Sequence, residues 1–335
     1  MEKVLTIAIP SYNTEQYIDK NVPTMLSPEI LDRLEILIID DGSSDNTALT
    51  AGKYHDLYPD TVKVVSKENG GHGSVINEGI RIATGRYFKV IDGDDWVEEG
   101  SLVRMIKDLE GINADMIIHP YYFVYEGTGS RSLERFEAPA YGEPLVFDQV
   151  CHLYQKIPIH SLTYRTQLLR EKGIRVREHC FYEDNEYDLF PVPFVETVAV
   201  YDYPVYMYLI ARKNQSVSDA NVLKNHRMFY RVVRDCIDCL EKNRESLSPE
   251  KTSYMTATVL ELVRSQYNIY LRSGFSRESY GKFRSFNSHF KASCPDYFRA
   301  AGERYPYLKV LQTGSFTAFR ALSLMIRVYK KVTMR

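Results

Sequence analysis

The sequence predicts an α/β fold in which helices cover a mainly parallel sheet, followed by a helical C-terminal extension. Three observations support this prediction. Short apolar runs alternate with helical patterns over the first 120 residues, as is typical of βαβ units. Polar residues follow each apolar run. From about Asn221 onward, the chain keeps a helical pattern and has few strand signals.

The predicted strands are runs rich in Ile, Val and Leu, and continuous apolar runs indicate strands that are buried on both faces. Between them, apolar residues recur at helical spacing. The predicted strands span residues 4–9, 35–40, 62–66, 87–92 and 115–119, and the predicted helices span residues 15–25, 45–55, 74–83 and 101–109. The pattern loosens after about Gly127, so residues 126–144 are predicted to form a surface loop.

Composition excludes several classes of protein. With 335 residues, 44% of them hydrophobic and 26% charged, the chain is an ordinary globular protein rather than a disordered one. A net charge of −2 gives no attraction to nucleic acid. Five irregularly spaced cysteines indicate a reducing compartment. The sequence shows neither a signal peptide nor a membrane-spanning run, so we expect a cytoplasmic protein.

The fourth predicted strand ends in three carboxylates within four residues, Asp92, Asp94 and Asp95. Carboxylates this close raise one another's pKa unless a cation lies among them. The segment is either a solvated turn or helix N-cap, where Asp is favoured, or a site for a hard divalent cation that also contacts substrate phosphate. Gly93 favours a ligand site, because glycine lets the backbone pass close to a ligand.

Polar segments also follow the second and third predicted strands. Asp40 and Asp41 can accept hydrogen bonds from a base N–H group or from ribose hydroxyl groups. Gly70, Gly71 and Gly73 allow a tight turn near a ligand. The first strand is not followed by the G-x-G-x-x-G spacing, which counts against a dinucleotide-binding fold.

Four segments resemble family 2 glycosyltransferases in sequence and in order: IAIPSYNTEQYI, EILIIDDGSSDNT, KENGGHGSVINEGIRIATGRYFKVIDGDDW and FYEDNEYDL. The match is dense from Val4 to Asp95, patchier to about Ser218 and absent from the C-terminal third. The resemblance implies an inverting, nucleotide-sugar-dependent enzyme with the Rossmann-like domain of the A-type glycosyltransferase fold. We expect a catalytic domain over residues 1–220, with a donor half (1–120) and an acceptor half (121–220), and a helical region over residues 221–335.

The resemblance also implies donor-binding residues. Asp92 and Asp94 resemble the family's DXD motif and, with Asp95, would hold Mg²⁺ or Mn²⁺ against the donor diphosphate. Asp41 would bind the base, typically uracil. The other donor-side residues implied are Pro10, Tyr12, Glu15, Asn69, Gly71, Asn77 and Gly93. The family often has Arg where this chain has Ile76, which leaves the exact sugar nucleotide open.

A second acidic segment, CFYEDNEYD, spans residues 180–188. From its residues alone, the segment can also be the charged start of a helix. An inverting transfer needs a base that takes the proton of the acceptor hydroxyl group. The resemblance to the family's ED motif implies that Asp184 is this base and that Glu183 supports it.

Two further positions are implied by the resemblance. His160 resembles a residue on the acceptor side, although a partly buried structural histidine is an equal alternative. Arg212 lies in the segment ARKNQSVSD, which resembles a loop that folds over the diphosphate. Arginine pairs well with phosphate, but a solvated basic turn explains Arg212 equally well.

The C-terminal tail is basic and amphipathic. Residues 304–335 include seven basic residues and no acidic one, with apolar residues at helical spacing. Such a helix can lie on an anionic membrane at the inner face of the cell membrane, which would suit a lipid-linked acceptor. It can equally dock on its own protein or on another subunit of a homo-oligomer.

Three functions remain as hypotheses. The first is inverting transfer of a hexose or N-acetylhexosamine from a UDP-sugar to a glycan or lipid-linked glycan, as in bacterial cell-surface polysaccharide synthesis. The second is a sugar-phosphate nucleotidyltransferase, which usually has a glycine-rich basic segment after the first strand that PSYNTEQ lacks. The third is a non-catalytic subunit of a polysaccharide assembly complex, against which the acidic clusters argue.

Overall fold

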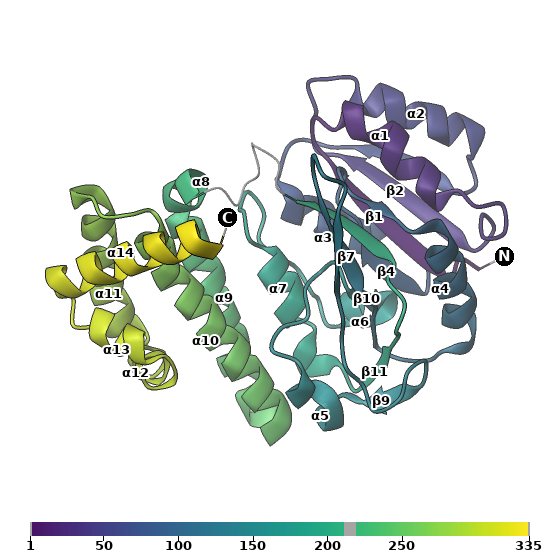
Figure 1. Ribbon diagram of the computed structural model, residues 1–335. Helices are drawn as coiled ribbons and strands as arrows, with labels where there is room; N and C mark the ends of the chain where they lie inside the picture. Colours follow the sequence, from purple (N-terminus) through teal and green to yellow (C-terminus); the bar gives the residue numbers. More distant parts are fainter. Residues whose placement is uncertain (1, 211–218, 334–335) are drawn as a thin grey trace. The chain divides into compact units, whose positions relative to one another are not determined.

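The computed structural model describes residues 2–210 and 219–333; residues 1, 211–218, 334 and 335 lie outside the described part (Figure 1). The chain divides into two compact units. The first comprises Met1–Lys213 with Glu241–Tyr254, and the second comprises Asn214–Leu240 with Met255–Arg335. The expected division into functional domains at residue 220 stays a prediction.

The described part of the first unit contains an eight-stranded sheet with the order β3-β2-β1-β4-β10-β6-β11-β9. β1 pairs in parallel with β2 and β4, whereas β10 is antiparallel to both β4 and β6. The predicted α/β fold is confirmed, and β10 and β9 make its sheet mixed. The strands are β1 Leu5–Ser11, β2 Leu34–Asp40, β3 Val62–Ser66, β4 Tyr87–Val90, β6 Met116–Ile118, β9 Pro144–Val146, β10 Leu162–Arg165 and β11 Thr197–Val200.

The central strands β1, β2 and β4 are buried along their whole length, because helices lie on both faces of the sheet (Figure 1). β3 is at the edge and is partly exposed. β4 ends at Val90 instead of the predicted Asp92, because the chain turns there into the acidic loop. The helices between the strands are α1 Glu15–Asn21, α2 Thr47–Leu57, α3 His72–Ile82, α4 Glu99–Gly111, α5 Phe147–Val150, α6 Thr166–Glu171 and α7 Asp184–Leu189.

A second, four-stranded sheet in the described part of this unit has the order β5-β12-β7-β8. Its strands are β5 Trp96–Val97, β7 Tyr121–Tyr125, β8 Arg131–Glu134 and β12 Tyr206–Ile210. The predicted surface loop at residues 126–144 is therefore partly wrong, since it contains β8 and the first residue of β9. β8 is polar and mostly exposed, so it has no apolar pattern by which a strand is recognised.

The second unit is helical, as predicted from about Asn221 onward. Its core is aromatic: Tyr267, Phe283, Phe290 and Phe319 are all buried, and the Phe283 and Phe319 rings stack with centroids 4.9 Å apart. Among the residues described, no helix has the length and apolarity needed to span a bilayer. The remaining helices of the chain are α8 Asp219–Lys224, α9 His226–Asn243, α10 Pro249–Arg272, α11 Arg277–Ser293, α12 Pro295–Arg304, α13 Pro306–Leu311 and α14 Phe316–Thr333.

Candidate active site

The polar loops that follow β1, β2 and β4 meet at one edge of the main sheet. Ser11, the last residue of β1, pairs with Asp40, the last residue of β2. After β4, the Ile91 N–H group donates to the Ala8 carbonyl oxygen at 3.0 Å, so this loop leaves beside β1. Ligand sites in open α/β sheets form at this edge, the carboxyl end of the parallel strands.

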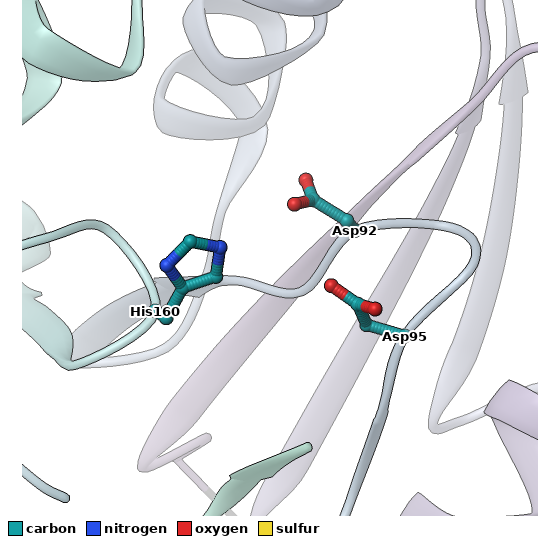
Figure 2. A group of neighbouring side chains, drawn as sticks. All are labelled: Asp92, Asp95 and His160. Carbon is teal, nitrogen blue, oxygen red and sulfur yellow. The ribbon is translucent and has the colours of Figure 1, made fainter. Parts of the chain in front are cut away.

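Asp92, Asp95 and His160 form a compact group at this edge (Figure 2). One ligand atom from each residue lies within 4.8 Å of the other two, and this is the cluster in the described part of the chain that can hold a metal ion. The two aspartates lie on the loop after β4, and His160 faces them from the segment before β10. Asp94 is partly exposed and lies outside this group, so its metal role stays a prediction.

The chemistry of this group fits a divalent cation. Burial and the charge of Asp92 raise the pKa of Asp95 well above its usual value, and a cation between the two carboxylates would relieve this repulsion. The oxygens of Asp95 also accept hydrogen bonds from the Tyr206 hydroxyl at 2.7 Å and from the Leu209 N–H at 2.8 Å. Carboxylate oxygens suit Mg²⁺ or Mn²⁺, and an imidazole nitrogen suits the transition metal better.

His160 is held against this group by aromatic rings and by a buried lysine. Its ring stacks on Tyr208 with centroids 4.1 Å apart, and its carbonyl oxygen accepts a hydrogen bond from Lys89 Nζ at 2.9 Å. Burial lowers the pKa of His160 to about 4, so the ring is neutral near pH 7, as a metal ligand must be. The expected acceptor-side role of His160 stays a prediction.

Gly93 packs against the loop that follows β1. A Cβ atom at this position would lie 2.5 Å from the Pro10 carbonyl oxygen and 3.0 Å from Thr14 Cγ2, so a larger residue would push the two loops apart. Pro10 is buried at the end of β1, while Tyr12 is 55% exposed. The predicted donor residues Pro10 and Gly93 are therefore neighbours.

Asp41 organises the glycine turn before α3. Its Oδ1 accepts hydrogen bonds from the Gly70 N–H and from Lys67 Nζ, each at 2.9 Å, and its Oδ2 accepts one from the Gly71 N–H at 2.7 Å. Asn69 Nδ2 donates to the Asp41 carbonyl oxygen at 2.8 Å. Three predicted donor residues thus lie together in one network, and the contact of Asp41 with a base stays a prediction.

Glu15 and Asn77, two more predicted donor residues, hold loops together. Glu15 accepts hydrogen bonds from the backbone and side-chain amides of Asn46 at 3.1 and 3.0 Å. Asn77 donates to the Val176 carbonyl oxygen and accepts from the Val176 N–H, each at 2.9 Å. Their donor contacts stay predictions, and Arg212 lies outside the described residues.

The segment 176–183 lies against the start of α3 and leads into the second acidic cluster. The His179 N–H donates to the Gly70 carbonyl oxygen at 2.5 Å. A Cβ atom on Gly73 would collide with the Arg177 carbonyl oxygen. His179 and Tyr182 have φ values of 50° and 75°, a strained conformation for residues other than glycine that is common at functional sites.

Glu183 and Asp184 lie where this segment enters α7. Glu183 is 3% exposed, and its Oε2 has no hydrogen-bond partner in the described part of the chain. Asp184 is partly exposed at the first position of α7. One turn further on, burial raises the pKa of Asp188 to about 7, although Lys156 Nζ lies 3.0 Å from its carboxylate.

His72 connects the two acidic clusters. Its Nε2 lies 2.9 Å from Asp92 Oδ1, and its Nδ1 lies 2.7 Å from Glu183 Oε1. Burial alone would lower the pKa of His72, but these carboxylates raise it well above its usual value. His72 was not predicted from the sequence. A histidine between two glycines, in a loop expected to approach a ligand, was the available signal.

A family comparison covers the part of the chain that carries this site. The profile described as Glycosyl transferase family 2 matches residues 6–176, slightly more than half of the chain. The chain therefore belongs to glycosyl transferase family 2, and the resemblance of its motifs is confirmed.

Two relatives are similar over the same region. The minor teichoic acid biosynthesis protein GgaB of Bacillus subtilis (strain 168) is 26% identical over 182 residues, which are 52% of this chain and 19% of GgaB. The uncharacterized glycosyltransferase EpsJ of the same organism is 26% identical over 213 residues, which are 62% of this chain and 61% of EpsJ. The chain thus spans less than two thirds of the length of either relative.

A solved structure shows the fold over nearly the whole chain. S. aureus TarS 1–349 in complex with UDP-GlcNAc superposes with a TM-score of 0.70 at 16% identity, covering 97% of this chain and 91% of that chain. At this identity the likeness concerns the fold, and it confirms the predicted A-type glycosyltransferase fold with a helical C-terminal region.

Proposed function

We propose that the protein is a metal-dependent, inverting glycosyltransferase. It takes a hexose or an N-acetylhexosamine from a UDP-sugar and transfers it to a glycan or lipid-linked glycan acceptor, as in bacterial cell-surface polysaccharide synthesis. The observation that carries this proposal is the pair of acidic groups at one sheet edge, Asp92 with Asp95 and Glu183 with Asp184. The UDP-GlcNAc bound by TarS and the teichoic acid pathway named for GgaB support it.

In this proposal the donor diphosphate lies beside the loop that follows β4. Asp92, Asp95 and His160 would hold the cation, with Asp94 as a further candidate. A cation bound there would neutralise charge on the departing nucleoside diphosphate. The glycine turn that Asp41 stabilises would bring the backbone close to the bound donor.

Asp184 is the proposed base. It takes the proton of the acceptor hydroxyl group as that oxygen attacks C1 of the sugar, the bond from C1 to the diphosphate oxygen breaks, and the configuration inverts. Its place at the start of α7, partly exposed and next to buried Glu183, makes it accessible to an acceptor. We further propose a location at the inner face of the cell membrane, with α14 in peripheral contact with lipid.

The proposal is tested by incubating purified protein with a panel of UDP-sugars, Mn²⁺ and candidate glycan acceptors. We expect release of UDP rather than pyrophosphate, which also separates this function from nucleotidyl transfer. Asp184→Asn should lower turnover by roughly 10²–10⁴-fold, the range of general-base effects. Asp56→Asn, at an exposed position in α2, is the matched control. Near wild-type turnover in the Asp184 variant would rule out its role as base.

A further inference from the structure

His72 occupies a fixed position between two loops that are far apart in sequence. It is the first residue of α3 and follows Gly71, whose φ of 83° suits glycine because the residue has no Cβ atom. The Gly71 N–H group is itself bound by Asp41. The turn that presents the ring is therefore anchored before any ligand binds.

The two partners of the ring lie in different functional segments. Asp92 belongs to the proposed cation group, and Glu183 precedes the proposed base by one residue, 111 positions after His72. Each ring nitrogen of His72 lies within hydrogen-bond distance of one carboxylate oxygen, so the ring links the two carboxylates.

Exposure distinguishes this ring from a histidine of the core. The His72 side chain is 32% exposed and that of Asp92 is 27% exposed, whereas the Glu183 side chain is 4% exposed. The ring is thus partly accessible from the site. In the described part of the chain, His72 is the group that pairs with the buried carboxylate of Glu183. A buried carboxylate without its partner is costly, so the segment around it moves when the partner is removed.

We propose that His72 is a positioning residue that sets the spacing between the cation-binding loop and the segment carrying the base. It acts through Asp92 and Glu183. This inference rests on the proposed function for its kinetic consequences, whereas the link itself is a property of the fold.

The test is a double-mutant cycle on His72 and Glu183. His72→Gln keeps a similar size, but its one amide nitrogen cannot donate to both carboxylates in opposite directions. We expect it to lower kcat by at least about tenfold, with a smaller change in the donor KM, because the positioning acts on the chemical step. In a Glu183→Gln background, the same substitution should lower kcat by less than about threefold, because coupled residues are not additive.

The matched control is His152→Gln, an exposed histidine shortly after α5 and outside the segments of the site, which should leave kcat unchanged. If His72→Gln lowers kcat by the same factor in the wild-type and Glu183→Gln backgrounds, the inference is wrong. The wild type, the two single variants and the double variant are also unfolded in urea without substrate. The decrease in unfolding free energy caused by His72→Gln should be smaller in the Glu183→Gln background. If the wild type turns over no UDP-sugar, the proposed function is wrong. The double-mutant cycle measured by urea unfolding then tests the link between His72 and Glu183 by itself.

Discussion

Gly73 and Gly52 are both helical glycines of the first unit, but their surroundings differ. A Cβ atom on Gly73 would collide with the Arg177 carbonyl oxygen and lie 3.0 Å from Glu183 Cγ. The same atom on Gly52 would meet nothing within 4 Å. The absence of a side chain at position 73 therefore lets the segment before Glu183 approach α3.

We predict opposite effects when each glycine is replaced by alanine. Gly73→Ala should displace residues 176–183, lower stability by roughly 1–3 kcal/mol and lower turnover up to about 10²-fold, since small misplacements of catalytic groups have large effects. Gly52→Ala should raise the free energy of unfolding by roughly 0.5–1 kcal/mol and leave turnover unchanged. Urea unfolding and UDP release measure both. Equal behaviour of the two variants would contradict the packing argument.

The buried histidine of the second unit predicts a pH dependence. Burial lowers the pKa of His226 from 6.5 to about 4, and its Nδ1 lies 3.0 Å from the Tyr270 hydroxyl. Between these two pH values the unfolded chain binds more protons than the folded chain, so stability falls as pH is lowered from about 6.5 toward 4. We expect the urea midpoint to fall over this range, and less steeply in His226→Gln. An unchanged slope in the variant would exclude His226 as a cause.

At the residue scale, the sequence predicted candidate site residues from motifs and strand ends, but it did not predict which side chains contact one another. Asp92, Asp41 and Glu183 were predicted because motifs mark them, and they lie at one sheet edge. The contacts of Asn77 with Val176 and of His72 with Glu183 join positions about a hundred residues apart. A local pattern has no information on which distant side chains meet, so these partners were not predictable.

At the scale of elements, the strands predicted best are those buried on both faces. β1 and β2 are largely apolar, and their limits lie within two residues of the predicted ones. The four residues of β10 and the exposed β8 were not predicted, because short or solvated strands are defined by their pairing partners. The order of strands in a sheet is likewise not a local property, so the mixed sheet was not foreseen.

Helix α14 leads to a prediction about membrane contact. Leu324 and Met325 are 48% and 67% exposed, the nearby Arg320 is exposed, and the sequence beyond residue 304 has no acidic residue. We expect the full chain to float with vesicles that contain anionic lipid. It should not float with neutral vesicles or at high salt concentration.

Two variants control the flotation experiment. Deletion of residues 315–335 should abolish flotation, and Leu324→Ser with Met325→Ser should weaken it without changing the fold, because both side chains are exposed. If the Leu324→Ser, Met325→Ser protein floats as well as the wild type, these side chains of α14 are not the contact. If the full chain fails to float and self-associates through this helix instead, the membrane proposal is wrong.

At the scale of the whole molecule, ligand binding should be visible as stability. A ligand that binds only the folded state raises its unfolding free energy, by about 2.7 kcal/mol at a concentration of 100 Kd. We expect UDP with Mn²⁺ to raise the melting temperature of the protein, and EDTA to abolish this rise. Asp95→Asn should reduce it. If UDP still raises the melting temperature in the presence of EDTA, nucleotide binding needs no cation.

The position of β10 has a consequence for biosynthesis. β10 pairs on one side with β4 and on the other with β6, although it is translated after both of them. Until residue 165 has left the ribosome, the backbone groups on one side of β4 have no partner strand. An unpaired strand edge of this kind can pair with another chain. Nascent chains that pause before this point, although they already carry the acidic loop and the glycine turn, are the species most in need of a chaperone.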